Sequence, residues 1–169
     1  MDEVHRILAA ADLTTAVGVA IALIVSGRCK VTEATRLRRR DIHRDHLGRI
    51  WLRVAGKPWN VRLPDALGAT LERFSASGDP DELLLSLNAR QTRSALQATA
   101  RRAGVERVTV AMFRHSLASA AVQVGVPVTG VSTWLSRRPP SLFGMKGPME
   151  EQWNAEMRTF VDRWLGCAE

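Results

Sequence analysis

The pattern of apolar residues in the first part of the chain predicts helices. The most apolar stretch, Leu13–Val25, is apolar on nearly every side, which is typical of a helix buried in the centre of a core. It can begin at Thr14 or Thr15, whose hydroxyls suit a helix N-terminus, and it ends near Gly27. A shorter helix is expected before it, reaching to about Ala10.

A run of arginines follows this helix. Thr32 is placed to cap a third helix, with Glu33 in its first turn and Leu37 on its inner face. The same helix is expected to carry Arg36, Arg38, Arg39 and Arg40. Such a run is either a solvated helix face or a surface that contacts an anionic partner.

Strict alternation replaces the helical pattern in the next segment. Apolar and polar residues alternate from Gly48 to Val54 and again from Trp59 to Leu63, and each stretch predicts a strand. The residues between them, Ala55–Pro58, are typical of a turn. Together they predict a β-hairpin.

The remaining pattern predicts five helices, separated by glycine, proline or polar residues. They are expected from Asp65 to Phe74, from Asn88 to Gly104, from Val110 to Val124, from Pro127 to Leu135 and from Met149 to Leu165. Asp65, Asn88 and Thr109 are placed to cap the first three of these helices. Ser75–Asp81 is a polar loop and the best candidate for a mobile linker, and Arg137–Pro148 is expected to be irregular. The pattern as a whole predicts one α+β domain over residues 1–169, mainly α, with a small antiparallel sheet.

Composition adds a strongly basic charge to this picture. The 169 residues carry a net charge of +7 with a sequence pI of about 10.9, and arginine supplies most of the positive charge. The planar guanidinium donates two parallel hydrogen bonds to phosphate. A small domain with this charge favours nucleic acid as its partner, ahead of an anionic membrane surface.

Other classes of protein fit the sequence less well. Two cysteines, Cys29 and Cys167, are too few for a disulfide framework or a structural zinc site, so we expect no metal and no cofactor. The apolar stretch Leu13–Val25 is shorter than the roughly 20 residues of a membrane span, and it lacks the features of a secretory signal. A cytoplasmic, nucleoid-associated location is the expectation.

Four short strings occur in a fixed order along the chain. They are Glu3–Ala10, Ser26–Glu33, Leu37–Ile42 and Phe113–Ala118. The second resembles a Thr-Gly-x-Arg-x-Ser-Glu signature, the third a Leu-Arg-Trp-x-Asp-Ile string and the fourth a Leu-Arg-His-Thr-Phe-Ala box. In this order they resemble the catalytic domain of the tyrosine recombinases, the phage-integrase family, and the resemblance implies that domain's helical fold with a small sheet.

The resemblance also implies a site, and the chain departs from it. The family attacks a DNA phosphate with a tyrosine, yet the chain contains no tyrosine. The family's reactive positions correspond here to Lys30, Lys57, Ala111, Arg114, His115, Arg137 and Lys146, the last at the nucleophile's place. Lys57, Arg114 and His115 are kept, and Arg28 is an alternative to Lys30. The resemblance therefore implies a catalytically inactive relative whose pocket keeps positive charge.

These observations predict a regulator or accessory factor, for example of a mobile element, that binds double-stranded DNA. The residues expected to contact DNA are Arg28, Lys30, Arg36, Arg39, Arg40, Lys57, Arg90, Arg93, Arg114, His115 and Arg137. One alternative is a decayed pocket in which Arg114 is a packed, structural arginine. Another is an enzyme whose nucleophile comes from a partner protein.

The expected last helix adds an alternative function, the binding of another protein. Trp153, Met157, Phe160 and Trp164 would lie on one apolar stripe within residues 149–169. Tryptophan is enriched at protein interfaces, so this helix could bind a second copy of the chain or an active recombinase. Equally, the stripe can pack on the core of its own chain, as amphipathic helices usually do.

Overall fold

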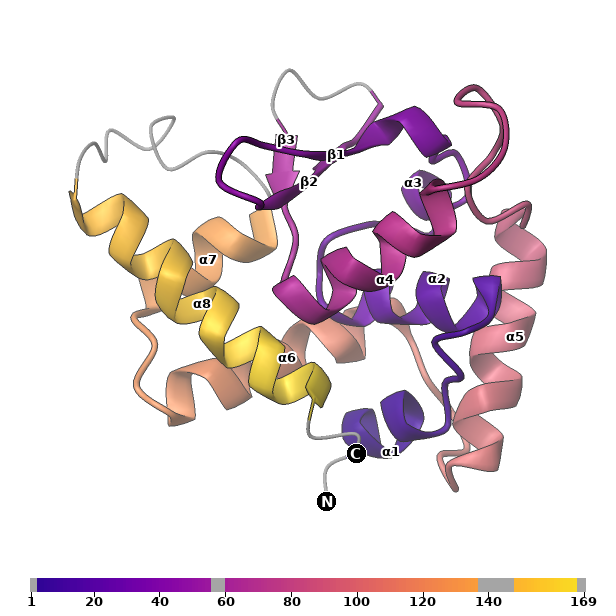
Figure 1. Ribbon diagram of the computed structural model, residues 1–169. Coiled ribbons are helices and arrows are strands. Elements are labelled where there is room, and N and C mark those ends of the chain that lie inside the picture. Colours follow the sequence, from indigo (N-terminus) through magenta and orange to yellow (C-terminus); the bar gives the residue numbers. More distant parts are fainter. Residues whose placement is uncertain (1–2, 56–59, 137–147, 167–169) are drawn as a thin grey trace.

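A computed structural model describes residues 3–55, 60–136 and 148–166. They form a mainly helical α+β fold with one three-stranded antiparallel sheet (Figure 1). This confirms the fold class at that level. Within the described ranges, no helix combines the length and the apolar character that crossing a membrane requires.

Helix α2, Ala16–Val25, lies in the interior of the molecule, above α1, Glu3–Ala9, in the view of Figure 1. The hydroxyl of Thr15 accepts a hydrogen bond from the amide of Gly18 at 3.1 Å, so the expected cap is confirmed. A β-carbon on Gly18 would lie only 1.9 Å from the carbonyl oxygen of Asp12. Glycine is therefore the residue that lets α2 start so close to the preceding loop.

The third helix is shorter than expected, and the arginine run lies outside it. Helix α3 spans Val31–Ala34, and the single 3-10 turn η1 spans Arg39–Asp41. The cap is Lys30 rather than Thr32, because the Glu33 carboxylate accepts a hydrogen bond from the Lys30 amide at 2.8 Å. The prediction of one helix carrying all the arginines was wrong.

Contacts with a distant segment explain this error. The carbonyl of Leu37 accepts a hydrogen bond from the amide of Leu84 at 2.7 Å, and the amide of Arg39 donates to the carbonyl of Glu82 at 3.1 Å. These bonds hold the chain extended where a helix would have continued. The arginines consequently project from an irregular segment at the edge of the sheet.

The sheet contains the predicted hairpin and one additional strand. Strands β2, Ile50–Arg53, and β3, Asn60–Arg62, form the hairpin, whose turn at 56–59 lies outside the described residues. Strand β1, Ile42–Arg44, pairs with the other side of β2 and was not expected. Leu52 lies opposite both Ile42 and Val61, which places these side chains on the inner face.

The other helices follow the predicted pattern closely. They are α4 at Asp65–Ser75, α5 at Ala89–Arg102, α6 at Val110–Gln123, α7 at Val128–Ser136 and α8 at Pro148–Gly166. Asn88 and Thr109 cap α5 and α6 as expected, whereas α4 is preceded by Pro64 rather than capped by Asp65. The loop after α4 is hydrogen-bonded to the arginine segment, since the Arg40 amide donates to the Pro80 carbonyl at 3.0 Å.

Two groups of buried side chains share α2. One joins α1, α5, α6, α7 and α8 to one side of the helix, and the other joins the sheet and α4 to its opposite side. A helix that is apolar on all sides can pack against both groups of side chains at once. The expectation of a central buried helix is thus confirmed.

Helix α8 uses its apolar stripe within its own chain. Met157, Val161 and Trp164 are buried in the core, while Trp153 and Phe160 are partly exposed. Trp153 packs on α7 at Gly130, where an added β-carbon would lie 3.1 Å from the Trp153 β-carbon. Packing in cis is therefore what the structure contains, and Met157 and Trp164 are not available to a partner in this arrangement.

Candidate nucleic-acid interface

A cleft of about 440 Å³ lies where the arginine segment meets the end of strand β2. Its lining consists of Arg36, Arg38, Arg40, Asp41, Arg53, Val54 and Ala55. Four arginines and one aspartate thus line the same space. We call this site the arginine cleft.

The carboxylate of Asp41 holds two parts of the arginine cleft in place. The residue is only 8% exposed, and its carboxylate accepts hydrogen bonds from the Arg38 amide at 2.9 Å and from Nε of Arg53 at 3.2 Å. The first bond fixes the backbone of turn η1, and the second holds the base of the Arg53 guanidinium. The two terminal nitrogens of Arg53 therefore remain available, and 53% of that side chain is exposed.

The other three arginines differ in how firmly they are held. Arg38 donates to the carbonyl of Asp81, and Arg40 forms an ion pair with the carboxylate of the same residue. Arg36 is exposed, and its side chain makes no hydrogen bond or ion pair with the described residues. Arg36 and Arg53 are thus the members of the cleft that are freest to take an anion.

Arg39 was predicted to bind DNA, but it points away from the arginine cleft. Its guanidinium donates to the carbonyl of Phe74 and lies 3.4 Å from the carboxylate of Glu82. Only 20% of the side chain is exposed. The η1 turn separates neighbouring side chains in space, so Arg39 serves to attach α4 while Arg38 and Arg40 line the cleft.

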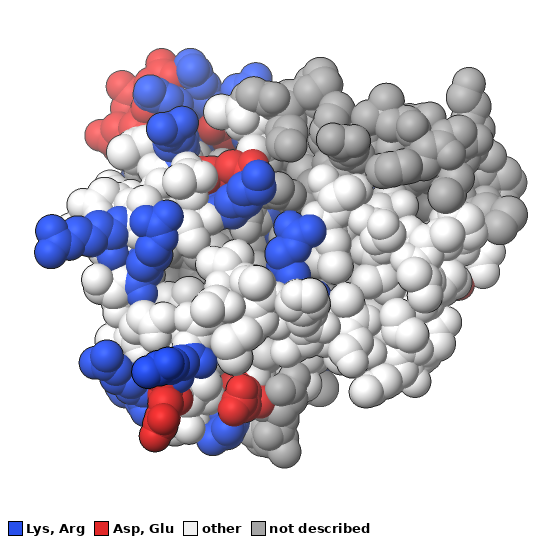
Figure 2. Space-filling view, turned by 180° about the vertical axis from the view of Figure 1, so that it is seen from behind, with Lys and Arg blue, Asp and Glu red and all other residues white. Residues whose placement is uncertain are grey.

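Basic side chains also lie beyond the cleft. Figure 2 shows Lys and Arg over the left half of the rear face, the side on which α5 lies, with acidic groups beside them at its upper left. Arg90 and Arg93 are exposed on α5, and Lys30 is exposed at the start of α3, but none of the three lines the arginine cleft. Their contact with DNA stays a prediction.

Arg28 was also predicted to reach DNA, and the structure contradicts this. The residue is 4% exposed, and its guanidinium lies 3.4 Å from the centre of the Trp134 ring. It donates to the Trp134 carbonyl at 2.7 Å and to the Arg62 carbonyl at 3.5 Å. Arg28 therefore joins α7 to the sheet from inside the protein.

Arg114 is bonded in a similar way. Its guanidinium donates at 3.2 Å to the carbonyl of Leu135, the residue directly after the Trp134 that Arg28 holds. Two arginines thus satisfy consecutive carbonyls in the last turn of α7, where the helix dipole favours positive charge. His115 and Ala111 are exposed on α6.

The predicted pocket extends over described and undescribed parts of the chain. Lys57, Arg137 and Lys146 lie outside the described residues. The structure thus brings together Arg28 and Arg114 at the end of α7, and it brings together Arg36 and Arg40 in the arginine cleft. These are two separate groups of contacts rather than one pocket.

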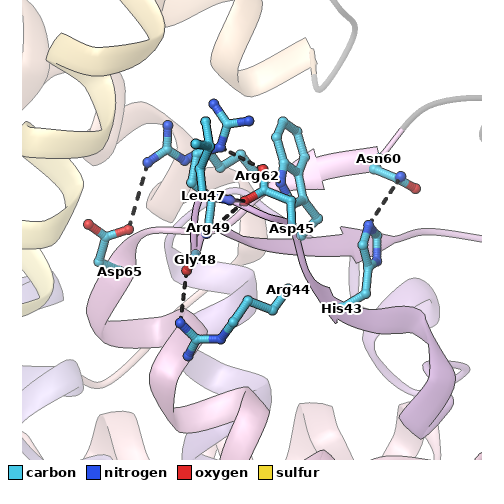
Figure 3. Close-up of polar contacts among 10 residues, drawn as sticks. His43, Arg44, Asp45, Leu47, Gly48, Arg49, Asn60, Arg62 and Asp65 are labelled. Carbon is cyan, nitrogen blue, oxygen red and sulfur yellow. Dashed lines mark hydrogen bonds and ion pairs between the residues drawn. The ribbon is translucent and has the colours of Figure 1, made fainter.

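A third group of arginines surrounds the turn between β1 and β2 (Figure 3). The Asp45 carboxylate accepts hydrogen bonds from Nε of Arg49 at 2.6 Å and from the indole of Trp51 at 2.9 Å. Partial burial alone would raise the pKa of Asp45, but these bonds and those from the Leu47 and Arg49 amides hold it far below its usual value.

The arginines near this turn are paired with acidic groups. Arg44 is bonded to both carboxylate oxygens of Glu72, and this hydrogen bonding lowers the pKa of Glu72. Arg62 lies 4.0 Å from Asp65 (Figure 3). Each of these carboxylates already neutralises an arginine, so the turn is a structural element and a poor site for an anion.

The sequence reasoning missed two members of the arginine cleft, Arg38 and Arg53. A signal for Arg53 was present, because strand alternation places it on the polar face of β2. Arg38 gave no such signal, since its position depends on η1. Within the described ranges, no three His, Cys, Asp or Glu residues are grouped as metal ligands.

Comparison with known proteins gives no family for this chain. No protein-family model, no curated protein and no solved structure matches it. The function must therefore be argued from the residues and their geometry.

Proposed function

We propose that this protein binds double-stranded DNA through the arginine cleft, without cutting it, and acts as a regulator or accessory factor. The observation that carries the proposal is the cleft itself, which is lined by four arginines and one buried aspartate. Arginine forks match the geometry of phosphate oxygens, and contacts to the phosphate backbone supply most of the affinity of a non-specific DNA complex.

The exposure of the cleft supports this proposal. Arg40 and Arg53 have side chains that are 50% and 53% exposed, so a phosphate can approach them without opening the core. The exposed Ala55 adds a small apolar surface beside the charges, which suits a deoxyribose. Contacts of this kind position a duplex and carry no sequence information by themselves.

The resemblance to tyrosine recombinases forms the second part of the proposal. We propose a relative of that family that no longer cleaves, located on DNA in the cytoplasm. The lack of tyrosine in the sequence supports this, and so does the bonding of Arg28 and Arg114 to the carbonyls of α7. Arginines used to join helices contribute less to a transition state than arginines directed at a phosphate.

A salt titration with matched variants tests the binding. The wild-type protein should bind a labelled duplex, and its affinity should fall steeply with salt. Arg36→Gln with Arg53→Gln should weaken binding about tenfold and reduce the magnitude of the salt slope by about 2. The control removes two exposed arginines outside the cleft, as Arg107→Gln with Arg163→Gln, and should have a much smaller effect. Equal losses in the two double variants would refute the assignment of the cleft.

A nicked duplex distinguishes binding from catalysis. An enzyme that takes its nucleophile from a partner would leave the covalent adduct on the partner's tyrosine, and only when this chain is present. The proposal predicts that a partner recombinase with an intact nucleophilic tyrosine and a disabled pocket of its own forms no adduct on the nicked duplex, with or without this chain. An adduct on that partner that depends on this chain would show that the enzyme alternative is correct.

A further inference from the structure

The loop between α4 and α5 returns to the edge of the arginine cleft. Backbone hydrogen bonds hold it there, because Arg40 donates to the Pro80 carbonyl at 3.0 Å and Arg39 donates to the Glu82 carbonyl at 3.1 Å. The carboxylate of Asp79 accepts a hydrogen bond from the Asp81 amide at 2.8 Å, which shapes the loop locally. Asp81 is consequently held beside the arginines.

Asp81 contacts two of the four arginines in the cleft. Its carboxylate forms the ion pair with Arg40, and its carbonyl oxygen accepts the hydrogen bond from Arg38. The two paired side chains are both largely in solvent, since Arg40 is 50% exposed and Asp81 is 59% exposed. The carboxylate therefore occupies the position at Arg40 where an anion from outside would bind.

We propose that Asp81 is an internal competitor that a DNA phosphate displaces from Arg40, and that it sets the affinity of the arginine cleft. This inference rests on the proposed function, because it assigns the regulation of the same site. The exchange breaks one ion pair and forms another, with no covalent step. Arg38 keeps its bond to the Asp81 carbonyl, which anchors the loop while the carboxylate moves aside.

The weakness of an exposed ion pair makes such an exchange feasible. Pairs between solvated side chains contribute little, because water screens them and both side chains lose freedom. A phosphate that also contacts Arg36 or Arg53 gains more than the carboxylate loses. Asp81 therefore lowers the affinity for DNA without preventing binding, and it disfavours single, weakly held anions more than a duplex.

The neighbouring residue provides a matched control. Asp81→Asn removes the carboxylate and keeps the carbonyl that Arg38 contacts. Glu82→Gln removes one charge at the next position, yet its partner Arg39 does not line the cleft. Asp81→Asn should tighten binding to a labelled duplex of mixed sequence about threefold to fivefold. Glu82→Gln should change it by less than about twofold, as a long-range charge effect.

A double-mutant cycle ties the effect to Arg40. In a chain that already carries Arg40→Gln, the tightening caused by Asp81→Asn should disappear, because the competed side chain is gone. Circular dichroism and thermal melting of each variant establish that it is folded. A gain that persists without Arg40, or equal gains in Asp81→Asn and Glu82→Gln, would overturn the competitor role. If the proposed DNA binding itself is wrong, the result differs from these outcomes, because the wild-type protein and every variant would then leave the duplex unbound even at low salt.

Discussion

Two groups of arginines in this protein carry the same charge and use it differently. Arg28 and Arg114 lie at the end of α7, where their guanidinium groups donate to the carbonyls of Trp134 and Leu135. Arg36 and Arg53 lie in the arginine cleft, where the Arg36 side chain has no hydrogen-bond or ion-pair partner among the described residues and the Arg53 guanidinium is held only at Nε, by Asp41. The first pair completes the fold, whereas the second pair is left available to a ligand.

The difference teaches that the number of arginines in a sequence does not say what they bind. A guanidinium that is buried against backbone carbonyls has exchanged its hydrogen bonds to water for hydrogen bonds to the protein. Loss of these bonds lowers the stability of the fold. A guanidinium that is held at Nε and solvated at its terminal nitrogens can exchange water for phosphate. Variants of the two groups should therefore affect different properties, namely stability for the first and DNA affinity for the second.

The largest effect should follow the loss of Arg28. Arg28→Ala removes the contact with the Trp134 ring and leaves the buried Trp134 carbonyl and the partly buried Arg62 carbonyl without this donor, so the free energy of unfolding should fall by about 3 kcal/mol. Urea denaturation measures this. Arg36→Ala should change stability by less than about 0.5 kcal/mol. Similar losses in both variants would remove the distinction between the two groups.

A pH titration tests the third group of arginines, around Asp45. The folded pKa of Asp45 lies below its unfolded value, so the carboxylate contributes stability that is present above the unfolded pKa. This stability is lost as the pH falls through about 4 toward the lower folded pKa.

The variant Asp45→Asn isolates that contribution. Its thermal midpoint should lie below that of the wild type at pH 7, and the gap should narrow below about pH 4. Thermal melts of both proteins across this range measure the gap. A gap that stays constant into strong acid would show that the Asp45 charge does not stabilise the turn.

Within the first group, a smaller loss of stability is expected for Arg114 than for Arg28. Arg114→Gln removes a hydrogen bond to a single carbonyl from a partly exposed side chain, so it should cost about 1 kcal/mol of stability. Its affinity for duplex DNA should stay close to that of the wild type, which a titration at fixed salt measures. A loss of affinity comparable to that of the cleft variant would show that Arg114 contacts DNA. The distinction between structural and DNA-binding arginines would then be wrong.

Features that depend on neighbouring residues could be predicted from the sequence. The caps Thr15, Asn88 and Thr109 each bond an amide three residues ahead, so the starts of their helices were predicted correctly. The hairpin likewise follows from alternation within a short segment. The sequence left the packing of α8 open, because an apolar stripe has the same pattern whether it packs on its own chain or on a second protein.

Features that depend on distant residues could not be predicted. The bond between Leu37 and Leu84 ends the expected helix and creates the turn that separates Arg39 from Arg38 and Arg40. No local pattern contains that information. For the same reason the string around Arg28 pointed to a DNA contact, although its stacking partner Trp134 lies more than a hundred residues later.

Arginine footprinting would test the central distinction most directly. Phenylglyoxal modifies accessible guanidinium groups, and mass spectrometry reports the rate at each arginine with and without duplex DNA. We predict protection of Arg36, Arg40 and Arg53 on DNA binding, unchanged modification of the exposed Arg107, and little modification of Arg28 in either state. Protection that spares the arginine cleft and falls on Arg107 instead would contradict the account.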